Sequence, residues 1–90
     1  MNKIKSKKDA QALVEKMVAT GTELQLWDEI NSSRIMIVEA HTELISKCVL
    51  TFVDSVTGMI DRYTAYKTEA VEAIYTNRKD VNRLNDLELL

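Results

Sequence analysis

The sequence predicts an all-α fold, and two observations favour it. Apolar residues recur at intervals of three and four over most of the chain, which is the spacing of one face of an α-helix. The chain of 90 residues also contains no proline and only two glycines, whereas all-β folds use both residue types in their many turns. We therefore expect a single helical domain over residues 1–90, built as a helical bundle or coiled coil with few loops.

The beginning of the chain predicts a basic tail and a short helix. Residues 1–7 are rich in lysine and are expected to be solvated. A helix is expected over residues 8–20, because its apolar residues follow helical spacing and Ser6 or Asp9 can cap its first turn. It should end at Gly21, since glycine readily adopts the left-handed conformation that closes helices.

A long helical segment is expected over residues 22–80, with possible breaks at 31–33 and 57–61. On a helical wheel at ~100° per residue, one apolar stripe continues through this segment. Asparagines are poor helix formers, so residues 81–90 should form a weaker end. The candidate interaction residues on or beside the stripe are Trp27, Val38, Ile45, Val49, Phe52, Val56, Met59 and Tyr63.

Gly58 leaves two architectures open. In the first, the chain turns near Gly58 as a helical hairpin and forms a three-helix bundle. In the second, Gly58 lies within one long helix at a cost of ~1 kcal/mol relative to alanine, and the stripe keeps its phase across it. Such a helix would be roughly 90 Å long at 1.5 Å per residue. It would have to bury its stripe against other chains in an oligomeric bundle.

Two further apolar residues lie on the polar side of the same wheel. Met36 and Leu50 fall within about 40° of one another at ~100° per residue. Single apolar residues at a surface are common. A pair on one side of a continuous helix could instead mark a second contact surface for a subunit or a target.

No catalytic, cofactor-binding or metal-binding motif is recognisable, so we expect a protein without enzymatic activity. His41 and Cys48 are the only metal candidates, and on a helix they would lie ~10.5 Å apart along the axis. That separation is too large for both to bind one zinc ion. The single cysteine also excludes an internal disulfide, and the sequence contains no glycine-rich phosphate loop.

The charge distribution bears on partners and location. The net charge of −2 gives no overall attraction to nucleic acid. Lys3, Lys5, Lys7 and Lys8 could nevertheless contact phosphates, so a nucleic-acid-binding accessory protein is the alternative function. No apolar run approaches the ~20 residues of a membrane span. No apolar leader follows the lysines, so a cytoplasmic location is expected.

The apolar stripe therefore predicts function through protein–protein interaction along a helix face. A regulator, an inhibitor or a chaperone-like adaptor would fit this prediction. The width of the stripe, about 140° on a wheel at ~100° per residue, implies cover by more than one neighbouring helix. We therefore expect self-association as a dimer or higher homo-oligomer, together with a protein partner that the sequence does not identify.

Overall fold

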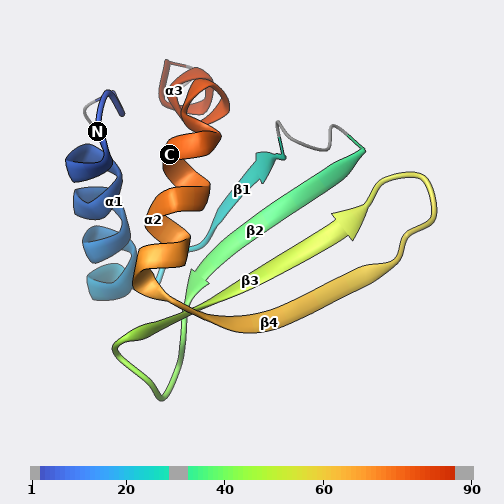
Figure 1. Cartoon of the computed structure of the whole chain (residues 1–90), viewed down its shortest axis with the longest axis horizontal. Coiled ribbons are helices and arrows are strands. Elements are labelled where there is room, and N and C mark those ends of the chain that lie inside the picture. Colours follow the sequence, from blue (N-terminus) through green and yellow to red (C-terminus); the bar gives the residue numbers. More distant parts are fainter. Residues whose placement is uncertain (1–2, 29–32, 87–90) are drawn as a thin grey trace.

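The computed structural model describes residues 3–28 and 33–86, with side chains to residue 84. It contains a four-stranded antiparallel sheet in the order β1-β2-β3-β4 (Figure 1). The elements are α1 (Lys7–Thr20), β1 (Leu24–Trp27), β2 (Arg34–Ala40), β3 (Lys47–Asp54), β4 (Ile60–Tyr66), α2 (Lys67–Thr76) and α3 (Arg78–Asp86). The all-α prediction is wrong. Four strands lie between Leu24 and Tyr66, where most of the long helical segment over 22–80 was expected, and only the last part of that segment is helical, in α2 and the start of α3. Neither a three-helix bundle nor a coiled coil forms.

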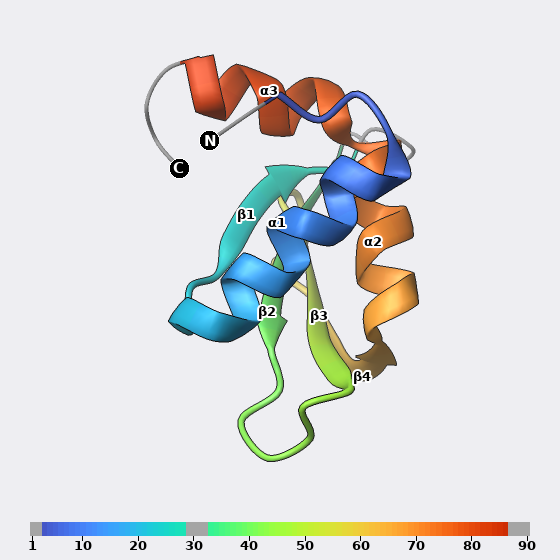
Figure 2. The same ribbon diagram turned by 90° about the vertical axis from the view of Figure 1, so that its left-hand side faces the viewer.

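The molecule has two layers. Helices α1 and α2 lie side by side over one face of the sheet, as Figures 1 and 2 show from two directions. Helix α3 contacts β1 and α2, and Figure 2 shows it across the end of the sheet beside the N-terminal segment. The opposite face of the sheet carries no helix among the described residues.

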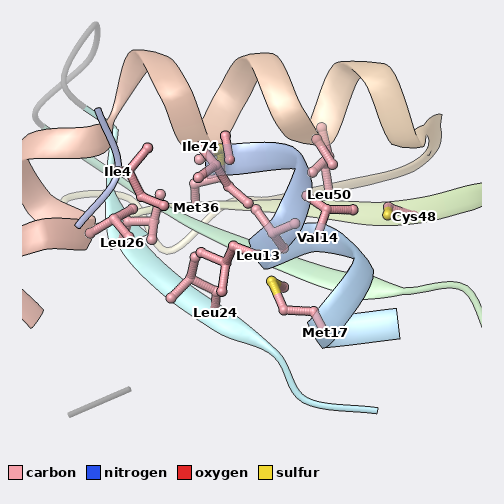
Figure 3. Packing of buried hydrophobic residues seen from close by; sticks show 14 of the residues in the cluster. Ile4, Leu13, Val14, Met17, Leu24, Leu26, Met36, Cys48, Leu50 and Ile74 are labelled. Carbon is pink, nitrogen blue, oxygen red and sulfur yellow. The ribbon is translucent and has the colours of Figure 1, made fainter. Parts of the chain in front are cut away.

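The core fills the space between the sheet and the two helices (Figure 3). Side chains from all four strands point toward α1 and α2, where the apolar faces of these helices meet them. Burial of this apolar surface is the main force that holds the two layers together. The buried residues are Ile4, Ala10, Leu13, Val14, Met17, Leu24, Leu26, Met36, Val38, Cys48, Leu50, Ala65, Ala70, Ile74 and Val81.

The residues expected in a long helix form strands because many of them are β-branched or aromatic. These side chains lose rotamer freedom in a helix and pack well on a pleated sheet. The stripe was misread because a step of four residues returns to the same side of both a helix and a strand. Cys48 and Phe52 share a side in either structure. Val49 was also placed on or beside the helical stripe, but it lies on the other face of the sheet.

The first helix follows its local signals, as the sequence predicted. The Ser6 side chain accepts a hydrogen bond from the Asp9 N–H, and the Asp9 carboxylate accepts one from the Ser6 N–H. Such a capping box satisfies two donors that a helix start otherwise leaves unpaired. Gly21 ends α1 with φ 68°, in the left-handed conformation, and its N–H donates to the Met17 carbonyl at 2.8 Å.

The described part of the expected basic tail is not free. Ile4 is 3% exposed and belongs to the core. The Asn82 side chain accepts from the Ile4 N–H at 2.7 Å and donates to the Ile4 carbonyl at 3.0 Å. These bonds fix the segment before α1 against α3. The prediction of a solvated tail over residues 1–7 therefore fails at Ile4, whereas the side chains of Lys3, Lys5, Ser6 and Lys7 are exposed.

The expected break at 57–61 covers the end of the turn after β3 and the first two residues of β4. Gly58 adopts φ 73° in the turn from β3 to β4, where its N–H donates to the Asp54 carbonyl at 2.8 Å. The Asp54 side chain accepts from the N–H groups of Val56 and Thr57 at 2.8 and 3.0 Å. The chain therefore reverses near Gly58, but between strands and not between helices. Of the other expected break, at 31–33, only Ser33 lies within the described residues.

The positive φ of Gly58 predicts the cost of replacing it. A Cβ at this position would meet no atom within 4 Å, so the cost of Gly58→Ala is conformational and should be about 1–2 kcal/mol. Urea denaturation should show this loss in the free energy of unfolding. Gly58→Asn is the matched control and should lose less, because asparagine tolerates the left-handed region. Equal stability of Gly58→Ala and the wild type would contradict the left-handed conformation assigned to Gly58.

Asp54 predicts a dependence of stability on pH. Hydrogen bonds from the backbone N–H groups of Thr57 and Val56 hold the pKa of the Asp54 carboxyl below its usual range. A lowered folded-state pKa contributes stability above the unfolded-state pKa of about 3.9. That contribution is lost as the pH falls through the folded-state pKa. The stability advantage of the wild type over Asp54→Asn should therefore shrink on acidification in urea denaturation. A difference in the free energy of unfolding that stays constant with pH would contradict a stabilising role of the ionised Asp54 carboxylate.

Candidate functional site

The sheet face that points away from α1 and α2 is the candidate functional site, and we call it the open face. Cross-strand partners lie on the same face of a sheet, and neighbours along a strand lie on opposite faces. The register therefore assigns the whole set once the core residues are known. The open face consists of Gln25, Trp27, Ile35, Ile37, Glu39, Lys47, Val49, Thr51, Val53, Ile60, Arg62, Thr64 and Tyr66.

The open face is more apolar than a solvated sheet face. An antiparallel sheet with one face in water normally alternates apolar and polar residues, whereas strands covered on both faces are apolar throughout. Strands β2 and β3 follow the second pattern, with Ile35, Ile37, Val49 and Val53 at positions where polar side chains are expected. The other three open-face positions of β2 and β3 are polar, so the composition of these strands matches that of a sheet with two covered faces only in part.

One line of apolar residues crosses all four strands, and we call it the apolar row. Trp27 pairs with Ile35, Ile35 with Val53, and Val53 with Ile60. The two outer members are the most accessible, with Trp27 45% and Ile60 69% exposed. The apolar row lies at the end of the sheet next to the turn from β3 to β4. This end of the open face therefore offers continuous apolar contact.

The other end of the open face is polar and hollowed. A depression of about 370 Å³ is lined by residues of β2, β3, β4 and the loop after β2. Across it the Arg62 guanidinium pairs with the Glu39 carboxylate at 3.0 Å. Outside the depression, at the same end of the open face, the Lys47 ammonium lies 3.1 Å from the centre of the Tyr66 ring. Exposed ion pairs add little stability. The charges of Arg62 and Glu39 cancel, however, so this pair adds no net charge to the depression.

The two residues that the sequence singled out for metal binding have structural roles. His41 Nδ1 accepts hydrogen bonds from the N–H groups of Glu43 and Leu44 at 3.0 and 3.1 Å, so the neutral ring carries its proton on Nε2. Cys48 is buried, and burial raises the pKa of its thiol, which keeps it protonated and unreactive. Within residues 3–28 and 33–86, no group of three or more His, Cys, Asp or Glu could hold a metal ion.

Three of the predicted interaction residues lie in the core. Val38, Met36 and Leu50 are at most 3% exposed, under α1 and α2. The second contact surface expected from Met36 and Leu50 therefore does not exist. The physical reason is the strand period: positions on opposite sides of a helical wheel fall on one face when the chain alternates with period two.

The remaining predicted residues are spread over three regions. Trp27 and Val49 belong to the open face. Phe52 and Tyr63 lie on the helix-covered side, with ring centres 6.0 Å apart. The connections between strands hold three strongly exposed residues: Ile45, Val56 and Met59. No single apolar helix face brings these residues together. The apolar row was missed except for Trp27, although the apolar runs 35–38 and 52–53 contain two of its members, Ile35 and Val53.

The lysines near the start of the chain are partly neutralised. The Lys7 ammonium pairs with the Glu72 carboxylate, and the Lys67 ammonium lies 3.6 Å from the Glu15 carboxylate in the same groove between α1 and α2. Alternating signs within one groove weaken its attraction for a phosphate backbone. The structure therefore adds no support for the nucleic-acid alternative.

No protein-family model, curated protein or solved structure shows significant similarity to the chain. None of the helices in the described parts of the chain is both long and apolar enough to cross a membrane. The inference of function therefore depends on the geometry of the open face.

The two faces of β2 predict losses of stability of different size when an apolar residue is replaced by threonine. Val38 is fully buried, and Val38→Thr places a hydroxyl in the core, which should cost about 1–3 kcal/mol. Ile37, its neighbour on the open face, is partly exposed, so Ile37→Thr should cost less than about 1 kcal/mol. Urea denaturation of both variants measures the difference. Equal losses would mean that both faces are covered in the isolated protein.

Proposed function

We propose that the protein acts by binding a protein partner through the open face. The apolar row carries this proposal, because a contiguous exposed apolar patch is uncommon on a monomer and marks sites of protein interaction. The apolar composition of β2 and β3 on both faces supports it further. A partner that covers the open face would add a third layer to the sheet and its helices.

The size of the surface suits a modest interface. A sheet four strands wide and seven residues long measures about 19 by 23 Å, which is smaller than the ~800 Å² that each partner buries in a standard interface. Val56 and Met59 lie beside the apolar row in the turn before β4, and both are strongly exposed. Contact with this turn would extend the apolar surface beyond the sheet.

Trp27 is suited to act as an anchor of the interface. Tryptophan is enriched among the few residues that supply most of the energy of protein interfaces. The Trp27 N–H donates to the Asp80 carboxylate at 3.0 Å, and Asp80 is itself paired with Arg83 at 2.8 Å. Helix α3 thereby fixes the backbone of Trp27 before a partner arrives, which reduces the entropy lost on binding.

The contacts of the open face favour a protein over a nucleic acid as the partner. Single-stranded nucleic acid is bound by aromatic rings together with free positive charge. On the open face Arg62 is paired with Glu39, and Lys47 is placed over Tyr66. A regulator, inhibitor or adaptor that works without enzymatic chemistry fits these contacts, and the cytoplasm remains the compartment that we expect for it.

The proposal predicts that a charge in the apolar row abolishes binding. Ile35 lies between Trp27 and Val53, so Ile35→Lys should place an ammonium group in the centre of the interface. Tagged wild type and variant are incubated with native cell extract, and retained proteins are measured by quantitative mass spectrometry. At least one protein should be retained tenfold less by Ile35→Lys, which corresponds to about 1.4 kcal/mol.

The matched control is Gln11→Lys, which adds the same charge to an exposed position of α1, away from the open face. It should retain the same proteins as the wild type. Circular dichroism should show that both variants keep the fold. Equal retention by Ile35→Lys and the wild type would contradict the proposal, as would a wild type that retains nothing beyond Ile35→Lys.

A further inference from the structure

We infer that β4 pairs edge to edge with β4 of a second copy of this chain, which joins two sheets into one antiparallel sheet of eight strands. This pairing goes beyond the proposed function, because it uses the backbone at the edge of the sheet and not the side chains of the apolar row. Its effect on the open face would be to double it.

The two edges of the sheet differ in their protection. Strand β1 is four residues long, and α3 lies against it. The Asp80 carboxylate accepts a hydrogen bond from the backbone N–H of Trp27. Strand β4 is seven residues long, and all of its residues except Ala65 are exposed. Long unprotected edges are templates for pairing with another chain. The edge at β4 is therefore the one that is open to a second copy.

The hydrogen-bond pattern shows which groups point outward. The Asp54 N–H donates to the Met59 carbonyl at 2.9 Å, and the Lys67 N–H donates to the Ser46 carbonyl at 3.3 Å. Hydrogen-bonded and non-bonded pairs alternate along an antiparallel ladder. Odd-numbered residues of β4 therefore bond to β3, and the even-numbered ones point their N–H and C=O groups away. The outward residues are Ile60, Arg62, Thr64 and Tyr66.

Prolines and bulges, two of the usual devices against edge pairing, are missing from β4, which carries the charged residues Asp61 and Arg62. The sequence contains no proline, and the register from Lys47↔Tyr66 to Val53↔Ile60 runs without a bulge. The Arg62 guanidinium lies on the open face, where it pairs with Glu39. These features leave the outer edge of β4 regular and accessible, whereas natural edges are commonly blocked by prolines, bulges or charges.

The sequence of β4 is complementary to itself about Tyr63. With a twofold axis at Tyr63, Ile60 lies opposite Tyr66 of the second copy, Arg62 opposite Thr64, and Asp61 opposite Ala65. Every residue of β4 is then paired. The outward N–H and C=O groups of one copy meet those of the other and form about eight hydrogen bonds. A register centred on Arg62 would instead oppose two guanidinium groups, which is unfavourable.

The same register covers exposed apolar surface on both faces. Ile60 and Tyr66 are 69% and 59% exposed in one copy, and the pairing brings them together on the open face. On the other face, the two Tyr63 rings meet beside their stacking partners Phe52. The apolar row of each copy would thereby continue from Ile60 to Tyr66 of the other.

Cysteine cross-linking tests the register. Residue 63 and its symmetry mate form a non-hydrogen-bonded pair with Cα atoms about 4.5 Å apart, within the range of about 4.4–6.8 Å that a disulfide spans. Residues 62 and 64 lie about 7–8 Å from their own mates, as diagonal neighbours. Tyr63→Cys should therefore form a reducible dimer on a non-reducing gel at least tenfold more than Arg62→Cys or Thr64→Cys. The buried Cys48 makes the wild type a background control.

A backbone variant tests the hydrogen bonds themselves. Thr64→Pro removes an outward N–H but no bond to β3, and proline is tolerated in edge strands when its position faces outward. Sedimentation equilibrium should show a dimer for the wild type and for Thr64→Val, which keeps the N–H, and at least a tenfold higher Kd for Thr64→Pro. If circular dichroism shows Thr64→Pro unfolded, Tyr63→Lys replaces it, because it opposes two ammonium groups at the twofold axis.

A wild type that is monomeric at about 100 µM, far above the Kd of an ordinary specific complex, would overturn the inference. So would equal cross-linking at positions 62, 63 and 64, or a dimer that none of the variants weakens. These outcomes are separate from failure of the proposed function. If Thr64→Pro and the wild type are both monomeric while Ile35→Lys loses its partner, only the edge pairing fails. If the dimer forms through residue 63 but Ile35→Lys retains all partners, only the proposed function fails.

Discussion

The apolar character of β2 and β3 on both faces is the constraint on which the rest of the structure depends. In the described part of the chain, α1 and α2 lie over the sheet, and both lie on the same face, above Val38 and Leu50. That arrangement gives one well-filled core from a chain of only 90 residues, which would be marginal if its helices were divided between two faces. The consequence is that no helix of the described residues covers Ile35 and Val53 (Figures 1 and 2).

Local signals predicted those parts of the fold that local interactions determine. The capping residue Ser6 and the terminating Gly21 lie within a few residues of the helix that they delimit, so α1 could be placed from sequence. Gly58 was correctly identified as a site where the chain could reverse. The pairing of Leu24 with Val38, or of Leu50 with Tyr63, depends on contacts between separate segments. No pattern within one segment encodes such contacts.

The open face was harder to predict than the core, because its residues are identified only by register. A shift of one position along a strand moves every side chain to the opposite face. The helical wheel grouped Val49 with Phe52, which the sheet separates, and placed Met36 apart from Val38, which the sheet joins. The unbroken apolar runs in β2 and β3 were the usable signal, since such runs are typical of strands covered on both sides.

The difference between the two edges bears on how large an assembly can become. An interface that uses the same strand in both copies is closed by its twofold symmetry, whereas a head-to-tail contact between different edges can continue into a filament. The contact of Asp80 with the Trp27 N–H and the position of α3 occupy the edge at β1. With β4 paired to β4 of the second copy, neither edge of the sheet would be free to pair with a further chain. The resulting dimer would present two apolar rows on one side of a single sheet, and Ile60 would belong to both the edge and the open face.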